Sequence, residues 1–168
     1  MARLVDRMLT LARADSGLEL QLAPVDLRTL VVEVCRQAAA VHPDRAILVE
    51  AVDATVAGDE DALRQLLWIL LDNALRHARS SVSVGLGVDG DWARLMVGDD
   101  GEGIALADRD RVFERFYKAE ASRAGQGAGL GLAIARWITS QHRGRIIAGA
   151  GSGGGAGLFV DLPLLRHS

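Results

Sequence analysis

Apolar residues recur along the chain with two different periods, and these periods predict its helices and strands. Spacings of three and four residues predict helices over 3–15, 26–40, 59–78 and 130–142. Alternating or β-branched runs predict strands over 46–52, 54–58, 81–88, 92–99, 144–151 and 157–163. A further short helix is expected near 107–116. No internal repeat is present, so the pattern indicates a single mixed domain.

The boundaries of these elements carry their own signals. Asp26 can cap the second helix, and either Asp59 or Asp61 can cap the third and longest one. Asp89-Gly90 separates two alternating runs and predicts a hairpin. We expect the short run 54–58 to pair with the strand before it. Mixed helices and hairpins indicate an α+β fold, a two-layer sandwich with helices on one face of the sheet.

Composition narrows the class of protein. The 168 residues suffice for one domain and a small appendage, and 49% hydrophobic content allows a sizeable core. A net charge of −3 argues against nucleic acid as a partner. The single cysteine, Cys35, fits a reducing cytoplasmic setting. The longest apolar run is too short to cross a bilayer, so we expect no membrane contact. We expect a cytoplasmic domain, the cytoplasmic part of a membrane-anchored protein.

The end of the longest helix carries polar residues where an apolar stripe would be expected. Asn73, Arg76 and His77 are spaced so that they share one face. An amide oxygen suits Mg²⁺, and the two basic side chains suit phosphates. A solvated helix end is an equally good reading of this group alone.

The segment 98–104, GDDGEGI, directly follows a predicted strand. A carboxylate there accepts hydrogen bonds, so it can read an exocyclic amine such as that of adenine, whereas guanine would present an unpaired acceptor. Gly101 and Gly103 would let the backbone approach a flat base. An ordinary acidic turn is the alternative.

Two further groups follow in order. Phe113, Phe116 and Tyr117 alternate with Arg115 and Lys118 in a chain with few aromatics, which suits either the anchor of a closing loop or core packing. Glycines then enter the helix at 125–135, where backbone N–H groups can bind an anion. A third glycine cluster, 149–157, fits a flexible loop better.

The order of these four groups resembles the catalytic ATP-binding domain of sensor histidine kinases, in the gyrase/Hsp90/histidine-kinase/MutL superfamily. The resemblance runs from about residue 25 to Pro163 and implies a Bergerat-type sandwich with a mixed sheet. Residues 1–22 resemble the end of the second dimerisation helix and its linker, which leaves 23–168 as the catalytic domain.

Position by position, the resemblance implies ATP and Mg²⁺ as ligands, with Asn73 holding the metal and 119–126 forming a lid. The implied ATP-binding residues are Asn73, Arg76, His77, Asp99, Gly101, Gly103, Ile104, Arg115, Phe116, Tyr117, Lys118, Gly127, Gly129, Leu130, Gly131 and Leu132. One position departs from the family pattern, because Ile69 stands where another asparagine is common. ATPases and serine kinases of the superfamily usually have glutamate there, so Ile69 favours histidine as the acceptor.

The acceptor itself is not expected on this sequence. His42, His77, His142 and His167 all lack an acid-flanked helical context. The resemblance therefore implies transfer of the γ-phosphoryl group to a histidine on a dimerisation domain, then to a response regulator, in a homodimeric full-length protein. Two alternatives are a degenerate nucleotide-binding regulatory module and a serine kinase acting on a protein partner.

Overall fold

The computed structural model describes residues 2–17, 19–118 and 129–166. Its helices are α1 (Ala2–Asp15), α2 (Leu27–Val41), α3 (Glu60–His77) and α4 (Gly131–Gln141). Its strands are β1 (Ala23–Asp26), β2 (Ala46–Ala51), β3 (Thr55–Gly58), β4 (Ser81–Asp89), β5 (Trp92–Asp99), β6 (Arg145–Ala150) and β7 (Ala156–Pro163). Two short 3₁₀ turns, η1 (Leu106–Asp108) and η2 (Arg111–Phe113), lie between β5 and α4.

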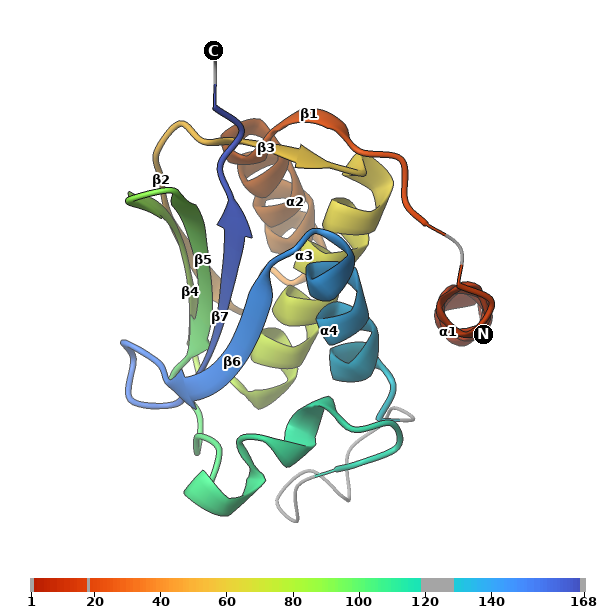
Figure 1. Cartoon of the computed structure of the whole chain (residues 1–168). Coiled ribbons are helices and arrows are strands. Elements are labelled where there is room, and N and C mark those ends of the chain that lie inside the picture. Colours follow the sequence, from red (N-terminus) through yellow and green to blue (C-terminus); the bar gives the residue numbers. More distant parts are fainter. Residues whose placement is uncertain (1, 18, 119–128, 167–168) are drawn as a thin grey trace.

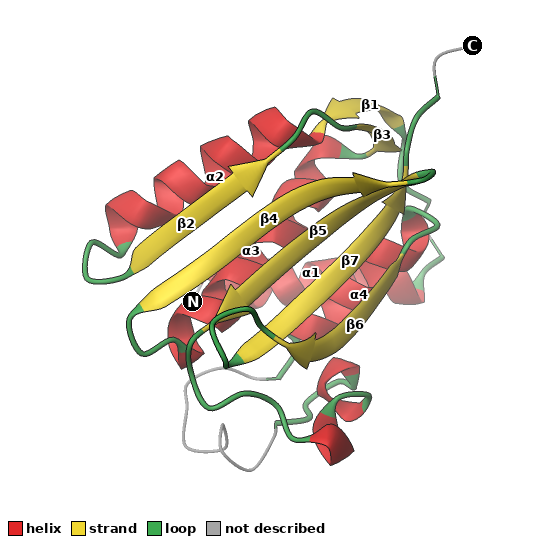
Figure 2. Ribbon diagram, turned by 90° about the vertical axis from the view of Figure 1, so that its left-hand side faces the viewer, coloured by secondary structure: helices red, strands yellow, loops and turns green. Residues whose placement is uncertain are grey.

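The main sheet has five strands in the order β2-β4-β5-β7-β6. β2 and β4 are parallel and the other pairs are antiparallel, which confirms the mixed sheet. Figure 2 shows the sheet in front of the helices, and Figure 1 shows α2, α3 and α4 on one side of it. The expected two-layer α+β sandwich is therefore confirmed.

The core lies between the sheet and this helical layer. Alternate strand residues such as Val82, Val84 and Leu86 are buried, because successive side chains of a strand point to opposite faces. The core side chains of α3 are Leu63, Leu66, Leu67, Leu70 and Leu71. Burying each contributes roughly 1.5–3 kcal/mol, so apolar packing fixes α3 against the sheet. No described helix has both the length and the apolarity needed to cross a bilayer.

The helix starts are set by aspartates, as predicted. The Asp26 carboxylate accepts a hydrogen bond from the Thr29 amide at 3.2 Å. Asp59, rather than Asp61, caps α3 and accepts from the Ala62 amide at 3.0 Å. The Asp59 amide in turn donates to Nε2 of buried His142 at 3.0 Å, which ties the end of α4 to the start of α3. These two helices thereby hold fixed positions beside one another.

The expected partner of β3 was wrong. β3 pairs with β1 in a separate two-stranded antiparallel sheet, and β2 pairs with β4 instead. β1 contains Pro24, which we took as the end of a turn. Proline is tolerated on an edge strand because no ladder donor is needed there. β1 has no other strand beside it than β3 among the described elements, so Pro24 costs no inner ladder bond.

The short helix expected near 107–116 is two separate 3₁₀ turns rather than one continuous helix. The segment forms η1 and η2, and its backbone bonds span three residues, as in Glu114 N–H to the Arg111 carbonyl. Buried Phe113 fixes its middle, and Phe116 ends it with a positive φ of 64°. A continuous α-helix cannot pass through that conformation.

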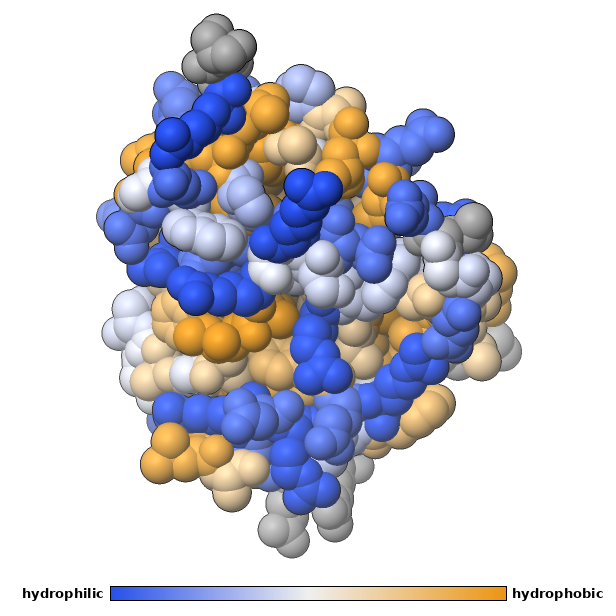
Figure 3. All heavy atoms as spheres, in the orientation of Figure 1, coloured by the Kyte–Doolittle hydropathy of each residue, from blue (hydrophilic) through white to orange (hydrophobic). Residues whose placement is uncertain are grey.

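Helix α1 lies on the far side of the helical layer from the sheet (Figure 1). Leu11 is buried, Thr10 accepts a hydrogen bond from the Gln65 amide at 3.1 Å, and Asp15 pairs with Arg115 at 2.7 Å. The face seen in Figure 3 mixes hydrophilic and hydrophobic residues. Helix α1 is thus held against the rest of the chain by two polar contacts and by the burial of Leu11.

Candidate functional site

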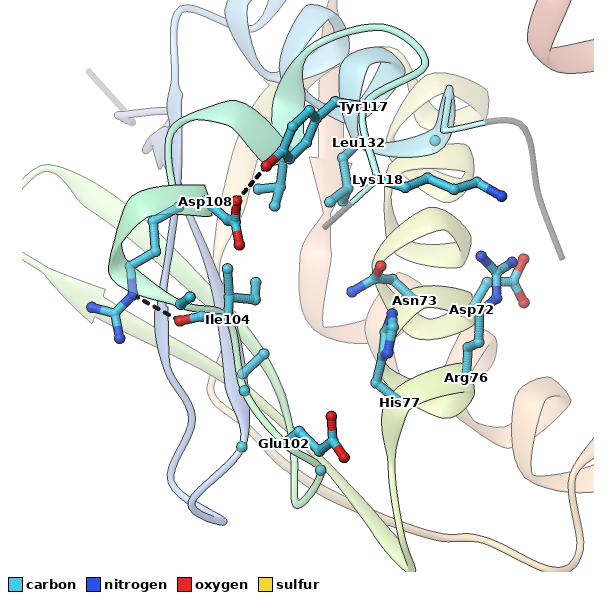
Figure 4. Close-up of a pocket in the computed structure, with 18 of the residues that line it drawn as sticks. Asp72, Asn73, Arg76, His77, Glu102, Ile104, Asp108, Tyr117, Lys118 and Leu132 are labelled. Atoms are coloured by element: carbon cyan, nitrogen blue, oxygen red, sulfur yellow. Dashed lines mark hydrogen bonds between the residues drawn. The ribbon is translucent and has the colours of Figure 1, made fainter. Parts of the chain in front are cut away.

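A cleft of about 890 Å³ opens between the C-terminal half of α3, the turn after β5, the η1–η2 segment and the start of α4. Figure 4 shows the side chains around it. The predicted nucleotide-binding residues that line this cleft are Asn73, Arg76, His77, Gly101, Gly103, Ile104, Tyr117, Lys118, Gly129, Gly131 and Leu132. Segments far apart in the sequence thus meet here.

The polar end of α3 forms one wall of the cleft. Asn73 and His77 project into the cavity, while Asp72 and Arg76 lie together on the neighbouring side of the helix (Figure 4). The spacing of four residues places each of these pairs on one face. One turn earlier, buried Ile69 also lines the cleft. The wall therefore changes from apolar to amide and imidazole along its length.

Burial lowers the pKa of the His77 imidazole, and the nearby Arg76 guanidinium lowers it further. The Asp99 and Glu102 carboxylates act in the opposite direction but do not reverse the shift. The ring is therefore neutral at pH 7 and can serve as a hydrogen-bond acceptor or as a flat packing surface.

This shift makes stability depend on pH. Because the unfolded chain binds the His77 proton more tightly than the native state does, this contribution is present above about pH 6.5 and is lost as pH falls toward the lower native pKa. His77→Gln should therefore lose less free energy of unfolding between pH 7.5 and pH 5.5 than the wild type does, as measured by urea titration. His42→Gln, outside the cleft, is the control; equal losses in wild type and His77→Gln would contradict the expectation.

Asp99 ends β5 and lies beneath the cleft floor, with 3% of its surface exposed. Its Oδ1 accepts hydrogen bonds from the Gly101 amide at 2.8 Å and the Ala156 amide at 3.3 Å. A Cβ on Gly155 would lie 2.3 Å from the same oxygen. The carboxylate is thus fixed by backbone on two sides, under a floor that only glycine can form.

The third glycine cluster is therefore not a flexible loop, and that interpretation was wrong. Gly155 donates its amide to the Asp99 carbonyl at 3.1 Å, and Gly151 donates to the Gly155 carbonyl at 2.8 Å. A Cβ on Gly151 would meet the Ala156 carbonyl oxygen at 2.5 Å. These glycines let the β6–β7 turn close against the end of β5.

The neighbouring carboxylate, Asp100, joins the floor to the end of α3. It accepts hydrogen bonds from the amides of Arg79, Ser80 and Ser81, the shortest at 2.7 Å, and from the Ser80 hydroxyl at 2.5 Å. The Ser80 hydroxyl and these amides hold the pKa of the Asp100 carboxyl well below its ordinary value. The loop after α3 and the turn after β5 are thus one hydrogen-bonded unit.

The aromatic and basic segment divides between cleft and core. Tyr117 lines the cleft and its hydroxyl donates to Asp108, while the Arg111 guanidinium lies 4.7 Å from its ring centre. Phe113 is buried, and Phe116 is 70% exposed. The core reading therefore holds for Phe113, and the loop-anchor reading of the other two aromatics stays a prediction.

Four of the predicted residues lie outside the lining of the cleft. Arg115 pairs with Asp15 of α1, Leu130 is buried, and Phe116 and Asp99 lie outside the lining surface. The Phe116 amide donates to the Gly129 carbonyl at 2.9 Å, so these two residues lie side by side. Gly127 and the expected lid, 119–126, lie outside the described residues.

Sequence reasoning missed several lining residues. The lining residues outside the predicted set are Arg7, Ile69, Asp72, Arg79, Glu102, Ala105, Asp108, Arg109, Val112, Ala150, Gly154, Gly155 and Ala156, of which the sequence analysis singled out only Ile69, as a departure from the family pattern. The density of glycines at 149–157 was a usable signal for the last group. Arg7 carried no local signal, because its place depends on how α1 docks.

Comparison with known proteins agrees with this geometry. The family model described as histidine kinase-, DNA gyrase B-, and HSP90-like ATPase matches residues 58–166. The chain belongs to this family. The signal transduction histidine-protein kinase BaeS of Escherichia coli is 37% identical over 99% of the chain, and the sensor histidine kinase TrcS of Mycobacterium tuberculosis is 36% identical over 99%.

Solved structures of family members share the fold. The mycobacterial sensor histidine kinase MprB superposes with a TM-score of 0.76 at 28% identity, over 87% of this chain and 99% of that one. Full-length ShkA in complex with AMPPNP superposes with a TM-score of 0.83 at 30% identity, over 99% of this chain and 36% of that one. The chain spans about 37% of the length of BaeS and 35% of TrcS.

Proposed function

We propose that this chain is the ATP-binding catalytic part of a sensor histidine kinase. The observation that carries the proposal is the polarity of the cleft: a buried carboxylate, Asp99, lies under one end, and Asn73, Arg76 and Lys118 line the remainder. An adenine amine needs an acceptor, and phosphates need cations and amides. The sensor kinases BaeS and TrcS, and ShkA with its AMPPNP, support the same assignment.

The residues present fit a nucleotide-bound Mg²⁺. The described residues contain no group of three or more histidine, cysteine or acidic side chains suited to a metal. Asn73 projects an amide into the cavity (Figure 4), and Mg²⁺ accepts such an oxygen together with phosphate and water oxygens. When bound, the metal would neutralise phosphate charge. Asn73 would orient it.

The chain's own residues position and neutralise rather than react covalently. Arg76, Lys118 and the amides at the start of α4 would hold the phosphates. His77, neutral at pH 7, would adjoin the nucleoside without adding charge. Position 69 of the cleft wall has an isoleucine where a carboxylate base would be needed to activate water or serine. A histidine acceptor needs no such base, because its imidazole is largely deprotonated at pH 7.

The acceptor histidine would come from the dimerisation domain of the same protein, of which residues 1–22 would be the end. Onward transfer would go to a response regulator, and the full-length protein would be a homodimer with this part in the cytoplasm. The alternative of a regulatory module without chemistry is favoured by one observation, the apolar Ile69 in the cleft wall.

Calorimetric titration tests the binding step. Wild type should bind AMPPNP more tightly with Mg²⁺ than without it, and should discriminate against a GTP analogue; Asn73→Ala should lose most of the metal-dependent part. No binding at millimolar nucleotide would refute the proposal. Incubation with labelled ATP and a dimerisation hairpin supplied in trans then separates the alternatives, because acid-labile phosphohistidine forms only if the chain is a kinase.

A further inference from the structure

The far end of the cleft contains an arginine from outside the catalytic domain. Arg7 of α1 lines the cleft, and its Nη2 lies 3.7 Å from Oδ2 of Asp72, the residue just before Asn73. Its Nη1 lies 3.5 Å from where a Cβ on Gly131 would be, and Gly131 is the first residue of α4. A guanidinium thus stands between the polar part of α3 and the N-terminus of α4.

The docking of α1 holds Arg7 in this position. Thr10, one turn further along, bonds to Gln65 of α3, and Leu11 is buried. Asp15 pairs with Arg115 at the other end of the helix. Arg7 is therefore carried to the cleft by a helix that is anchored on both α3 and the η1–η2 segment.

The direction of the cleft decides which part of a nucleotide Arg7 would meet. The carbonyl of His77 lies against Gly101, where a Cβ would come within 2.0 Å of it, so His77 marks the adenine end. Ile69 lies eight residues earlier in α3, which is roughly 12 Å along the helix axis. Ile69 and Arg7 both lie beside Gly131, so they mark the opposite end. A sugar and a triphosphate span about that length, which brings the terminal phosphate to Arg7.

We propose that Arg7 binds the terminal phosphate of the nucleotide, so that the helix preceding the catalytic domain supplies part of the site. The inference rests on the proposed binding of ATP. The Arg7 guanidinium forms an ion pair with the Asp72 carboxylate, with Nη2 and Oδ2 3.7 Å apart. A terminal phosphate offers more charge and a matching fork of oxygens, so the guanidinium exchanges Asp72 for phosphate or bridges both.

This arrangement couples nucleotide binding to the position of α1. If docked α1 strengthens binding of the triphosphate, the triphosphate strengthens docking of α1 by the same factor. A diphosphate, which does not reach Arg7, leaves docking unchanged. Docking of α1 would thus respond differently to ATP and to ADP.

The test compares nucleotides on one set of variants. Arg7→Ala should weaken AMPPNP binding by roughly tenfold or more, the effect of losing a charge-assisted hydrogen bond, and should change ADP binding less than threefold. Arg13→Ala, which removes the same charge from an exposed position on the same helix, is the matched control and should affect neither. Arg7→Lys should recover part of the loss. Calorimetry gives the affinities, and thermal unfolding verifies that each variant is folded.

Two outcomes would overturn the inference while leaving the proposed function intact. Equal losses for AMPPNP and ADP would place Arg7 at an inner phosphate or give it a structural role. An unchanged or tighter affinity of Arg7→Ala for AMPPNP would mean that Arg7 obstructs the cleft. Failure of the wild type itself to bind either nucleotide would refute both proposals. That outcome is seen before any variant is measured, so it cannot be confused with failure of the Arg7 inference alone.

Discussion

Asp99→Asn is expected to weaken binding of AMPPNP roughly 100-fold, through a change of one atom beneath the cleft floor. Both backbone donors to Asp99, from Gly101 and Ala156, use Oδ1. An asparagine keeps those two bonds only by placing its carbonyl oxygen there. Its NH₂ group then takes the place of Oδ2 and faces the adenine amine, donor against donor. Calorimetry measures the loss.

A second buried carboxylate, outside the cleft lining, supplies a matched control for Asp99. Asp161 of β7 is also a buried carboxylate, but it accepts from Arg94 at 2.8 Å and from Arg145 at 2.9 Å, on residues remote from the cleft lining. Asp161→Asn should leave nucleotide affinity unchanged even where it lowers stability. An Asp99→Asn affinity within threefold of wild type would remove Asp99 as the adenine-reading residue.

Gly101→Ala is expected to lower the free energy of unfolding by about 3 kcal/mol. The added Cβ would lie 2.0 Å from the His77 carbonyl oxygen and 3.0 Å from Asp99 Oδ1. Neither neighbour is the mobile end of a side chain, because one is backbone and the other is held by two amides. The chain must therefore move either the end of α3 or the turn after β5. Urea unfolding measures the change.

Gly87→Ala is the control for this substitution. Gly87 lies in β4, and a Cβ there would meet nothing within 4 Å. Its free energy of unfolding should stay within about 0.5 kcal/mol of wild type. If Gly101→Ala proved as mild as Gly87→Ala, the close approach of α3 to the cleft floor would be wrong.

The parts of the site that follow from local periodicity were predictable from the sequence. Asn73, Arg76 and His77 share a face because helical spacing requires it, and Asp99 with Gly101 follows a strand whose alternation is visible. The mixed sheet and its helical layer likewise follow from the element pattern together with the family resemblance.

The missed features depend on contacts between distant segments. Arg7 reaches the cleft only because α1 docks on α3, and nothing around residue 7 encodes that docking. The β1–β3 pairing was hidden because Pro24 reads as a turn when its edge position is unknown. Gly155 looked like part of a flexible loop because the residue that it must avoid, Asp99, is far away in the sequence.

The hydrogen bonds of Asp100 have a consequence for the entropy of binding. They join the loop after α3 to the turn after β5, so this end of the cleft, where we propose that adenine binds, loses its conformational freedom when the chain folds. A ligand that occupies only this end orders no further backbone there, and its affinity reflects contacts alone. The opposite end of the cleft, in contrast, is lined by Lys118 and by Arg7 of α1, so its shape depends on how that helix docks.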